Sequence, residues 1–408
     1  MDRNNTNQVF LTDIETNKEL KLIPGSPITN AVRTITTDVD EICKQKGLAF
    51  AKEITENFVG DFEKTEDMVK AGIHPEADKM VHVTTFMVID DMIYLTYYAN
   101  TKNPAENPEF QTARLAYRPV NNPNDITILD VQTVGDAVDG RVINQVYDTI
   151  MMRKDQDTIF VMWTARIDEN YYRFYRPFNI ETKTFGEVGV HRFKVGNVIN
   201  DFSVTGIKTA LAENDLPIKN MFADIGIMQK TSSHVENGKT YYYTGAYSGD
   251  FTCIIKSTDL ITWEYVSQPD FDTESIWENA TYIIGDKAYY FVRQHNESPY
   301  SFLTAYDLNT KKWDAPVLIG DCQSRGDMIV YKDNLYLFHA PISREHIGIV
   351  KIDTDNIANS SVVLQAKMDT SCFYPFIEYF KDGELAMSYT VNREHVRLAK
   401  FTLSKYLY

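Results

Sequence analysis

The sequence predicts an all-β chain that forms one six-bladed β-propeller with a partly helical N-terminal extension. Three observations carry this prediction. A hairpin made of a short strand, a tight polar turn and a second, aromatic-rich strand recurs six times along the chain. Several of the turns hold Asn-Gly, Asp-Gly or Gly-Asp pairs, which suit short hairpin loops with positive φ. The 25 Tyr and 22 Phe among 408 residues favour pleated sheet over a helical bundle.

The six hairpins, taken in order, define the domains. Their first strands begin near residues 82, 147, 233, 277, 325 and 374, and the last three copies start about 48 residues apart. Each copy is followed by a third strand, and four antiparallel strands repeated around an axis make a propeller blade. We therefore expect an N-terminal extension over residues 1–70, packed on the propeller or closing it, and the propeller over residues 71–408.

Three segments fall outside this repeat. Residues 38–63 have a helical pattern, and residues 121–145 and 190–228 are expected to be loop insertions. A β-sandwich or a tandem of small β domains is the alternative architecture. Six copies of one hairpin without linkers between them disfavour it.

Composition narrows the possible partners and the compartment. The 57 acidic and 41 basic residues give a net charge of −16, which argues against nucleic acid and anionic membrane surfaces as partners. No stretch approaches the roughly 20 apolar residues that span a bilayer. The four cysteines are scattered without metal-like spacing and are expected to be reduced core thiols, so no metal or cofactor is expected. The polar N-terminus predicts a cytoplasmic protein, or a secreted one whose signal peptide has been removed.

The residues that open the first strands and end the second strands are expected to meet at one mouth of the central channel. They are polar or aromatic, where a purely structural repeat would favour small apolar residues. Those at the first strands are His82, Tyr147, Asp148, His234, Trp277, Glu278, Arg325 and Tyr374. Those at the second strands are Asn100, Arg166, Tyr247, Arg293, His339 and Arg393. This composition predicts a binding site at the mouth, locally positive despite the net charge.

The second half of the chain, residues 228–408, resembles the sialidase-like propellers. Ser257-Thr-Asp259-Leu-Ile-Thr-Trp263 is similar to their Asp-box, in which the Asp accepts backbone N–H groups and the Trp packs between blades. The stretches at 277–293, 335–344 and 373–393 resemble the strand pairs that carry a catalytic Glu, two substrate-binding Arg and a nucleophilic Tyr. His82 stands where sialidases carry a further Arg.

The resemblance implies a glycoside hydrolase that acts on an acidic or hydroxyl-rich sugar. Tyr374 would be the nucleophile and Glu278 its base, within hydrogen-bonding reach, because a phenol attacks poorly unless a carboxylate takes its proton. Glu106, Glu109 or His82 would protonate the leaving oxygen. The expected substrate-binding residues are Arg293, Arg325, Arg344, Trp277, Tyr147, Asp148, His234, His339 and Arg166.

Two other functions remain open on the sequence. A polysaccharide lyase would use His82 or His234 with a Tyr for β-elimination, while Arg neutralises a uronate. A non-catalytic propeller would bind carbohydrate or protein at the same mouth. The expected partner of either enzyme is an oligosaccharide or glycoside.

Overall fold

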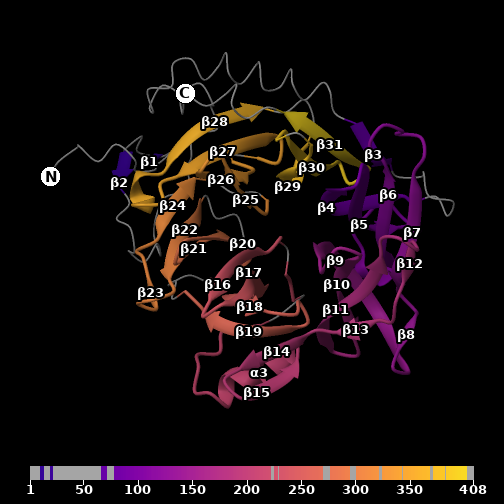
Figure 1. Ribbon diagram of the computed structural model, residues 1–408, viewed down its shortest axis with the longest axis horizontal. Helices are drawn as coiled ribbons and strands as arrows, with labels where there is room; N and C mark the ends of the chain where they lie inside the picture. Colours follow the sequence, from indigo (N-terminus) through magenta and orange to yellow (C-terminus); the bar gives the residue numbers. More distant parts are fainter. Residues whose placement is uncertain are drawn as a thin grey trace.

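The chain forms six β-sheets arranged around a central axis in chain order, as Figure 1 shows in the computed structural model. The structure describes residues 10–12, 19–21, 66–70, 78–221, 225–227, 229–269, 276–294, 300–320, 324–341, 343–367, 371–381 and 383–401. The six-bladed propeller predicted from the hairpin repeat is therefore confirmed. The helical segment expected at residues 38–63 lies outside the described residues. Within the described part of the chain, no helix is both long and apolar enough to cross a membrane.

The first two blades each follow the strand order of the repeat from the channel outward. Blade one consists of β4 (Met80–Ile89), β5 (Met92–Asn100), β6 (Gln111–Pro119) and β7 (Thr127–Thr133), with the short helix η1 (Pro108–Phe110) before β6. Blade two consists of β9 (Arg141–Arg153), β10 (Thr158–Ile167), β11 (Asn170–Asn179) and β12 (Thr184–Phe185). The short strands β8 (Ala137–Val138) and β13 (Gly189–Val190) pair with β9 and β11.

Blade three is enlarged by a segment that the sequence suggested to be a loop insertion. Its repeat strands are β16 (Ser232–Glu236), β17 (Lys239–Ser248), β18 (Phe251–Ser257) and β19 (Thr262–Ser267). The hairpin β14 (Arg192–Val195) and β15 (Val198–Asp201) extends the sheet beyond β19, where it lies at the bottom of Figure 1. Helix α3 (Val204–Ala212) is capped by Ser203, which accepts the Gly206 N–H, and buries Ile207 and Leu211.

Blades four and five keep the hairpin repeat. Blade four consists of β20 (Ile276–Ile284), β21 (Lys287–Gln294) and β22 (Tyr300–Asp307), with β23 (Lys312–Trp313) and β24 (Val317–Gly320) both pairing with β22. Blade five consists of β25 (Asp327–Tyr331), β26 (Asn334–His339), β27 (His346–Ile352) and β28 (Ser361–Lys367), with η2 (Ile357–Asn359) before β28.

The last blade closes the ring with a strand from before the first blade. It consists of β29 (Phe373–Tyr379), β30 (Leu385–Val391) and β31 (His395–Phe401), and β3 (Glu66–Lys70) pairs antiparallel with β31. In Figure 1 the indigo β3 lies beside the yellow β31. Pairing the two ends of the repeat leaves the outer edge of the last sheet covered. A separate two-stranded hairpin joins β1 (Phe10–Thr12) and β2 (Glu19–Lys21).

Apolar side chains between neighbouring blades form the core. Trp163 and Trp263 are fully buried, and Cys253 and Cys372 are buried free thiols, as expected; Cys43 and Cys322 lie outside the described residues. The hairpin turns that link first and second strands place short polar residues in the left-handed region, such as Asp91 at φ +62°.

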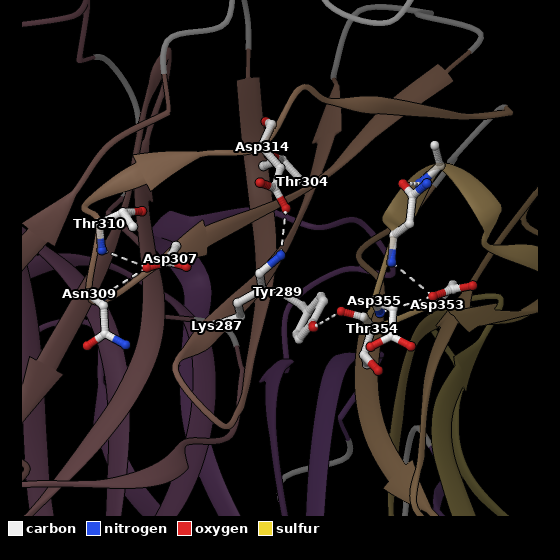
Figure 2. A network of polar contacts seen from close by, with 12 residues as sticks. Lys287, Tyr289, Thr304, Asp307, Asn309, Thr310, Asp314, Asp353, Thr354 and Asp355 are labelled. Carbon is white, nitrogen blue, oxygen red and sulfur yellow. Dashed lines mark hydrogen bonds and ion pairs between the residues drawn. The ribbon is translucent and has the colours of Figure 1, made fainter.

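A repeated turn follows the third strand of three blades. Asp259 Oδ1 accepts the backbone N–H groups of residues 261 and 262 in blade three, at 2.8 Å each. Asp307 accepts those of residues 309 and 310 in blade four, and Asp353 those of residues 355 and 356 in blade five. Figure 2 shows the turns of blades four and five, joined by the Tyr289 hydroxyl, which donates to the Thr354 carbonyl at 2.7 Å. These side chains satisfy backbone groups that the sheet leaves unpaired.

Candidate functional site

Tyr374, Glu278 and Arg293 lie together at the end of the propeller where the inner strands β20 and β29 begin, which is called the mouth below. Glu278 lies on β20 and Arg293 on the neighbouring β21, and the guanidinium donates to the carboxylate at 2.5 Å. The Tyr374 side chain, which comes from β29 two blades away, interacts with the same carboxylate and lowers its pKa. These three residues, which the sequence analysis placed at one mouth, therefore lie close together.

Two further arginines lie over the Tyr374 ring. The Arg325 guanidinium carbon is 5.5 Å from the ring centroid and that of Arg344 is 5.8 Å from it. Arg325 is fully buried and stands two residues before β25, so it precedes the inner strand that it was expected to open. Three arginines therefore converge on one tyrosine.

A β-bulge in each of four inner strands turns the side chains at the mouth. The bulged pairs are residues 83 and 84, 148 and 149, 277 and 278, and 374 and 375. Val83, Asp148 and Tyr374 occupy the same position of their bulges and have φ of +47°, +53° and +54°. Left-handed backbone is costly for such residues, a β-branched valine above all. Strained backbone repeated at one end of a propeller is typical of a functional site.

The charges of the group determine which partner holds the proton. Burial raises the pKa of Glu278, but Arg293, the hydrogen bonds from Tyr374 and Arg293 and the charge of Arg325 outweigh it, and the net pKa is lowered. Burial first, and then the Glu278 charge, raise the pKa of Tyr374 well above its usual value. The resting site therefore holds an ionised carboxylate beside a neutral phenol.

His82 is the buried neighbour of Tyr374. The two rings meet edge to face with centroids 5.0 Å apart, and His82 also contacts Tyr98 and Phe373. Burial lowers the pKa of His82 to about 3, so its imidazole is neutral at neutral pH. It is positioned to pack and to accept or donate one hydrogen bond rather than to carry a positive charge.

Glu106 reaches the same cluster from the loop after β5. The buried Asn100 side chain shapes this loop, because its amide donates to the Ala105 carbonyl at 2.9 Å and its oxygen accepts the Lys102 N–H at 2.8 Å. The Glu106 carboxylate then accepts the Tyr98 hydroxyl at 2.5 Å. Glu109, the other acid candidate, is exposed on η1.

A third part of the mouth is aromatic and comes from blades two and three. Tyr147 stacks on Tyr171 with centroids 6.1 Å apart. The Tyr247 hydroxyl donates to Asp148 at 2.8 Å, and both rings join an apolar cluster that includes Tyr98 and is contacted by Tyr374. This aromatic wall continues the group that holds Glu106.

Several expected site residues lie elsewhere. His234 pairs with Tyr241 near the hairpin turn, at the end of its blade opposite the mouth, because Gly226 and not β16 pairs with Tyr247. The expected mouth position of His234 was therefore wrong. Arg166, in contrast, stays beside the aromatic part of the mouth, with its guanidinium carbon 5.8 Å from the centroid of the Tyr171 ring, and it also pairs with the exposed Glu169. The His339 ring lies over Gly348 within blade five.

The side chain of Trp277 is outside the described part of the structure. The sequence analysis placed Arg393 at the rim without assigning it a role, and it did not identify Phe373, Tyr98 or Ser324 as site residues. The one sequence signal for Phe373 is its position directly before Tyr374. Tyr98 belongs to an aromatic run whose pattern is typical of a buried core strand.

Below the mouth, Lys230 links three blades. It lies just before β16, and its ammonium is 3.1 Å from Asp327 of blade five and also donates to the Ile377 carbonyl of blade six. Asp327 in turn accepts the Ile377 N–H at 2.8 Å. Residues 324–327 thus hold β29 in place on one side of Tyr374. Among the described residues, no group of three or more His, Cys, Asp or Glu side chains could hold a metal ion.

Comparison with known proteins gives matches in structure alone. No family model and no curated protein matches the sequence. The NanB sialidase of Streptococcus pneumoniae superposes with a TM-score of 0.53 at 8% identity, covering 84% of this chain and 71% of that one. The fold is that of the sialidases.

Two intramolecular trans-sialidases have the same sialidase-like fold. The enzyme from leech matches with a TM-score of 0.52 at 12% identity, covering 84% of this chain and 70% of that one. The enzyme from Ruminococcus gnavus matches with a TM-score of 0.52 at 10% identity, covering 84% of this chain and 98% of that one. At these identities the match concerns the propeller architecture.

Proposed function

We propose that the protein is a glycoside hydrolase that acts on an acidic sugar at the channel mouth, with Tyr374 as the nucleophile and Glu278 as its base. The observation that carries the proposal is the convergence of Tyr374 and Arg293 on the ionised Glu278 carboxylate, whose pKa both residues lower. Burial and the charge of Glu278 keep the phenol neutral at rest, so it needs an acceptor for its proton when it attacks. Glu278 is that acceptor, and Arg293 holds it in place.

The proposed first step transfers the glycosyl group to the enzyme. The phenolic oxygen of Tyr374 forms a bond to the anomeric carbon as its proton passes to Glu278. The bond from that carbon to the aglycone oxygen breaks, and this oxygen takes a proton from a general acid. Water then attacks the anomeric carbon and gives its proton to the carboxylate of the general acid, while the bond from that carbon to the Tyr374 oxygen breaks and this oxygen takes its proton back from Glu278. Among the acid candidates we favour Glu106, since its carboxylate contacts His82 and Tyr98, and His82 packs against Tyr374.

The test combines kinetics with trapping. Tyr374→Phe and Glu278→Gln should each abolish turnover of activated aryl glycosides of acidic sugars, while thermal melting shows that both variants fold. A glycosyl fluoride with fluorine beside the anomeric carbon should add one glycosyl mass to the wild type, and peptide mapping should locate it on Tyr374. Turnover by Tyr374→Phe at the wild-type rate would exclude the nucleophile.

Binding without turnover is the second candidate function. It is favoured by the Glu106 carboxylate, which is ion-paired to Arg393 rather than held protonated. Product analysis separates the possibilities: a hydrolase releases a reducing sugar, a lyase gives an ultraviolet-absorbing unsaturated uronate, and a binding protein gives neither. The position of His234 away from the mouth removes one of the two bases considered for the lyase.

A further inference from the structure

A groove between blades three and four holds His234, the histidine that was expected at the mouth. The groove encloses a cavity of about 560 Å³, within the roughly 300–1,000 Å³ range of small-molecule sites. It lies at the hairpin turns, so it is at the opposite end of the blades from Tyr374. The polar side chains that line it from the two blades include His234, Glu236, Lys256, Asp286 and Asn309.

The floor of the groove is apolar and aromatic. Tyr243 and Tyr306 are buried members of the cluster between blades three and four. Val266 and Leu308 pack against this cluster and are only half-buried, and both line the cavity. Apolar surface is therefore left facing the space between the polar walls.

The wall from blade three is a rigid set of hydrogen bonds. The Glu236 carboxylate accepts the hydroxyl of the buried Tyr243 and, at 2.7 Å, the Lys256 ammonium, which lies 4.4 Å from the centroid of the Tyr241 ring. Burial raises the pKa of Glu236, but the hydrogen bonds from Lys256 and Tyr243 outweigh it, and the net pKa is lowered. An ionised carboxylate accepts about four hydrogen bonds, so Glu236 can accept further ones from a ligand.

The wall from blade four places an amide and a carboxylate side by side. Asp307 accepts the N–H groups of residues 309 and 310, at 2.9 and 2.7 Å, which fixes the turn that carries Asn309 (Figure 2). The Asn309 amide then donates to Oδ2 of Asp286 in the β20–β21 turn, at 2.9 Å. Nε2 of His234 lies 3.7 Å from the other Asp286 oxygen. Donors and acceptors thus stand together before any ligand binds.

The charges in the groove nearly cancel. Its carboxylates and lysines are those of Glu236, Glu264, Asp286, Lys256 and Lys311. Glu236 and Glu264 each have a lysine partner, at 2.7 and 2.9 Å. The described residues that line the groove therefore provide no excess positive charge for a phosphate or a carboxylate, and a neutral ligand fits them better.

We propose that this groove is a further carbohydrate-binding site, which takes one neutral pyranose. Neighbouring hydroxyls of the sugar bind Asp286 and Asn309, since each hydroxyl both donates and accepts a hydrogen bond. The C–H groups of one ring face pack on Val266 and Leu308. The inference does not rest on the proposed function, because the groove is at the other end of the propeller from Tyr374.

The test follows sugar resonances by ligand-observed NMR as the full chain is added. Glucose, galactose and mannose are the probes, and acyclic sorbitol is the comparison, because it has hydroxyl groups but no ring. We expect at least one hexose to bind at least tenfold more tightly than sorbitol. Asp286→Asn should weaken that hexose at least tenfold, because a charged acceptor becomes a neutral amide. Asn309→Ala should also weaken it, because a donor is lost.

The matched control is Asp314→Asn, which changes a carboxylate of the same blade that is 41% exposed and paired with Lys287 outside the groove. It should bind the hexose as the wild type does, and so should Tyr374→Phe, while thermal melting checks that every variant folds. No binding of any hexose, wild-type affinity in Asp286→Asn and Asn309→Ala, or an equal loss in Asp314→Asn would each overturn the proposal. Loss of binding in Tyr374→Phe would place the sugar at the mouth and overturn it as well. If Tyr374→Phe still turns over glycosides while Asp286→Asn loses the hexose, the proposed mechanism fails and this inference stands.

Discussion

The backbone N–H of Tyr374 donates a hydrogen bond to Oγ of Ser324 at 2.8 Å, across the boundary between blades five and six. Tyr374 is at the bulge of β29 with φ +54°, and its own strand offers that N–H no ladder partner. A side chain from the neighbouring blade therefore fixes the backbone of the proposed nucleophile.

Ser324→Ala should cost both stability and activity. The Tyr374 N–H would lose its acceptor, which corresponds to about 1–3 kcal/mol. A shift of the tyrosine should lower kcat by about 10- to 100-fold. Ser388→Ala is the matched control, because the buried Ser388 hydroxyl has no hydrogen-bond partner among the described residues. Urea unfolding and kcat are measured, and equal behaviour of the two variants would contradict the assignment.

Removing Arg293 should destabilise the protein more than removing an exposed arginine. The Glu278 carboxylate is 4% exposed, and without Arg293 it would be left buried without its main counter-charge. Breaking a buried pair from one side costs about 3–5 kcal/mol. Arg192→Ala, from an exposed pair, should cost at most about 1 kcal/mol. Chemical denaturation of Arg293→Ala and Arg192→Ala gives the free energy of unfolding of each variant. Similar losses in the two variants would show that water solvates the Glu278 carboxylate.

Lys230 and Asp327 should show strong energetic coupling. Asp327 is buried, and despite Lys230 and the Ile377 N–H its pKa is raised by burial. Lys230→Met removes the cation and should cost about 3–5 kcal/mol, whereas the double variant with Asp327→Asn no longer buries an unpaired charge. We expect the double variant to be more stable than Lys230→Met. Additive losses in the double-mutant cycle would mean that the pair does not interact.

Acid should destabilise the protein through buried histidines. Burial lowers the pKa of His191 to about 3, and in the unfolded chain a histidine titrates near about 6.5. The unfolded state therefore takes up the proton first. The stability that His191 contributes is complete above pH ~6.5 and is lost as the pH falls toward 3, at up to about 1.4 kcal/mol per pH unit.

His191→Gln should reduce this pH dependence. Its side chain does not titrate, so the difference in unfolding free energy between pH 7 and pH 5 should be smaller than in the wild type. The comparison is made within each protein, which removes the constant cost of losing the Trp263 hydrogen bond to His191. An unchanged difference would show that His191 is protonated in the folded state.

The sequence by itself was enough to predict the six blades and to propose the Glu278–Tyr374 pair at the mouth. Turn residues and strand patterns act between near neighbours in the chain, so a hairpin repeated six times can be recognised without a structure. The pairing of Glu278 with Tyr374 was implied by the resemblance to sialidase-like propellers, together with the place of both residues at the start of inner strands.

Only the tertiary structure decided what surrounds that pair. Arg393 and Glu106 are 287 residues apart, and they meet because closure of the ring brings the last hairpin against blade one. His234 does not lie at the mouth, because residues 225–227, and not β16, occupy the inner position of blade three at that end. Such contacts depend on how blades twist and how loops cross between them, and no pattern of neighbouring residues records either.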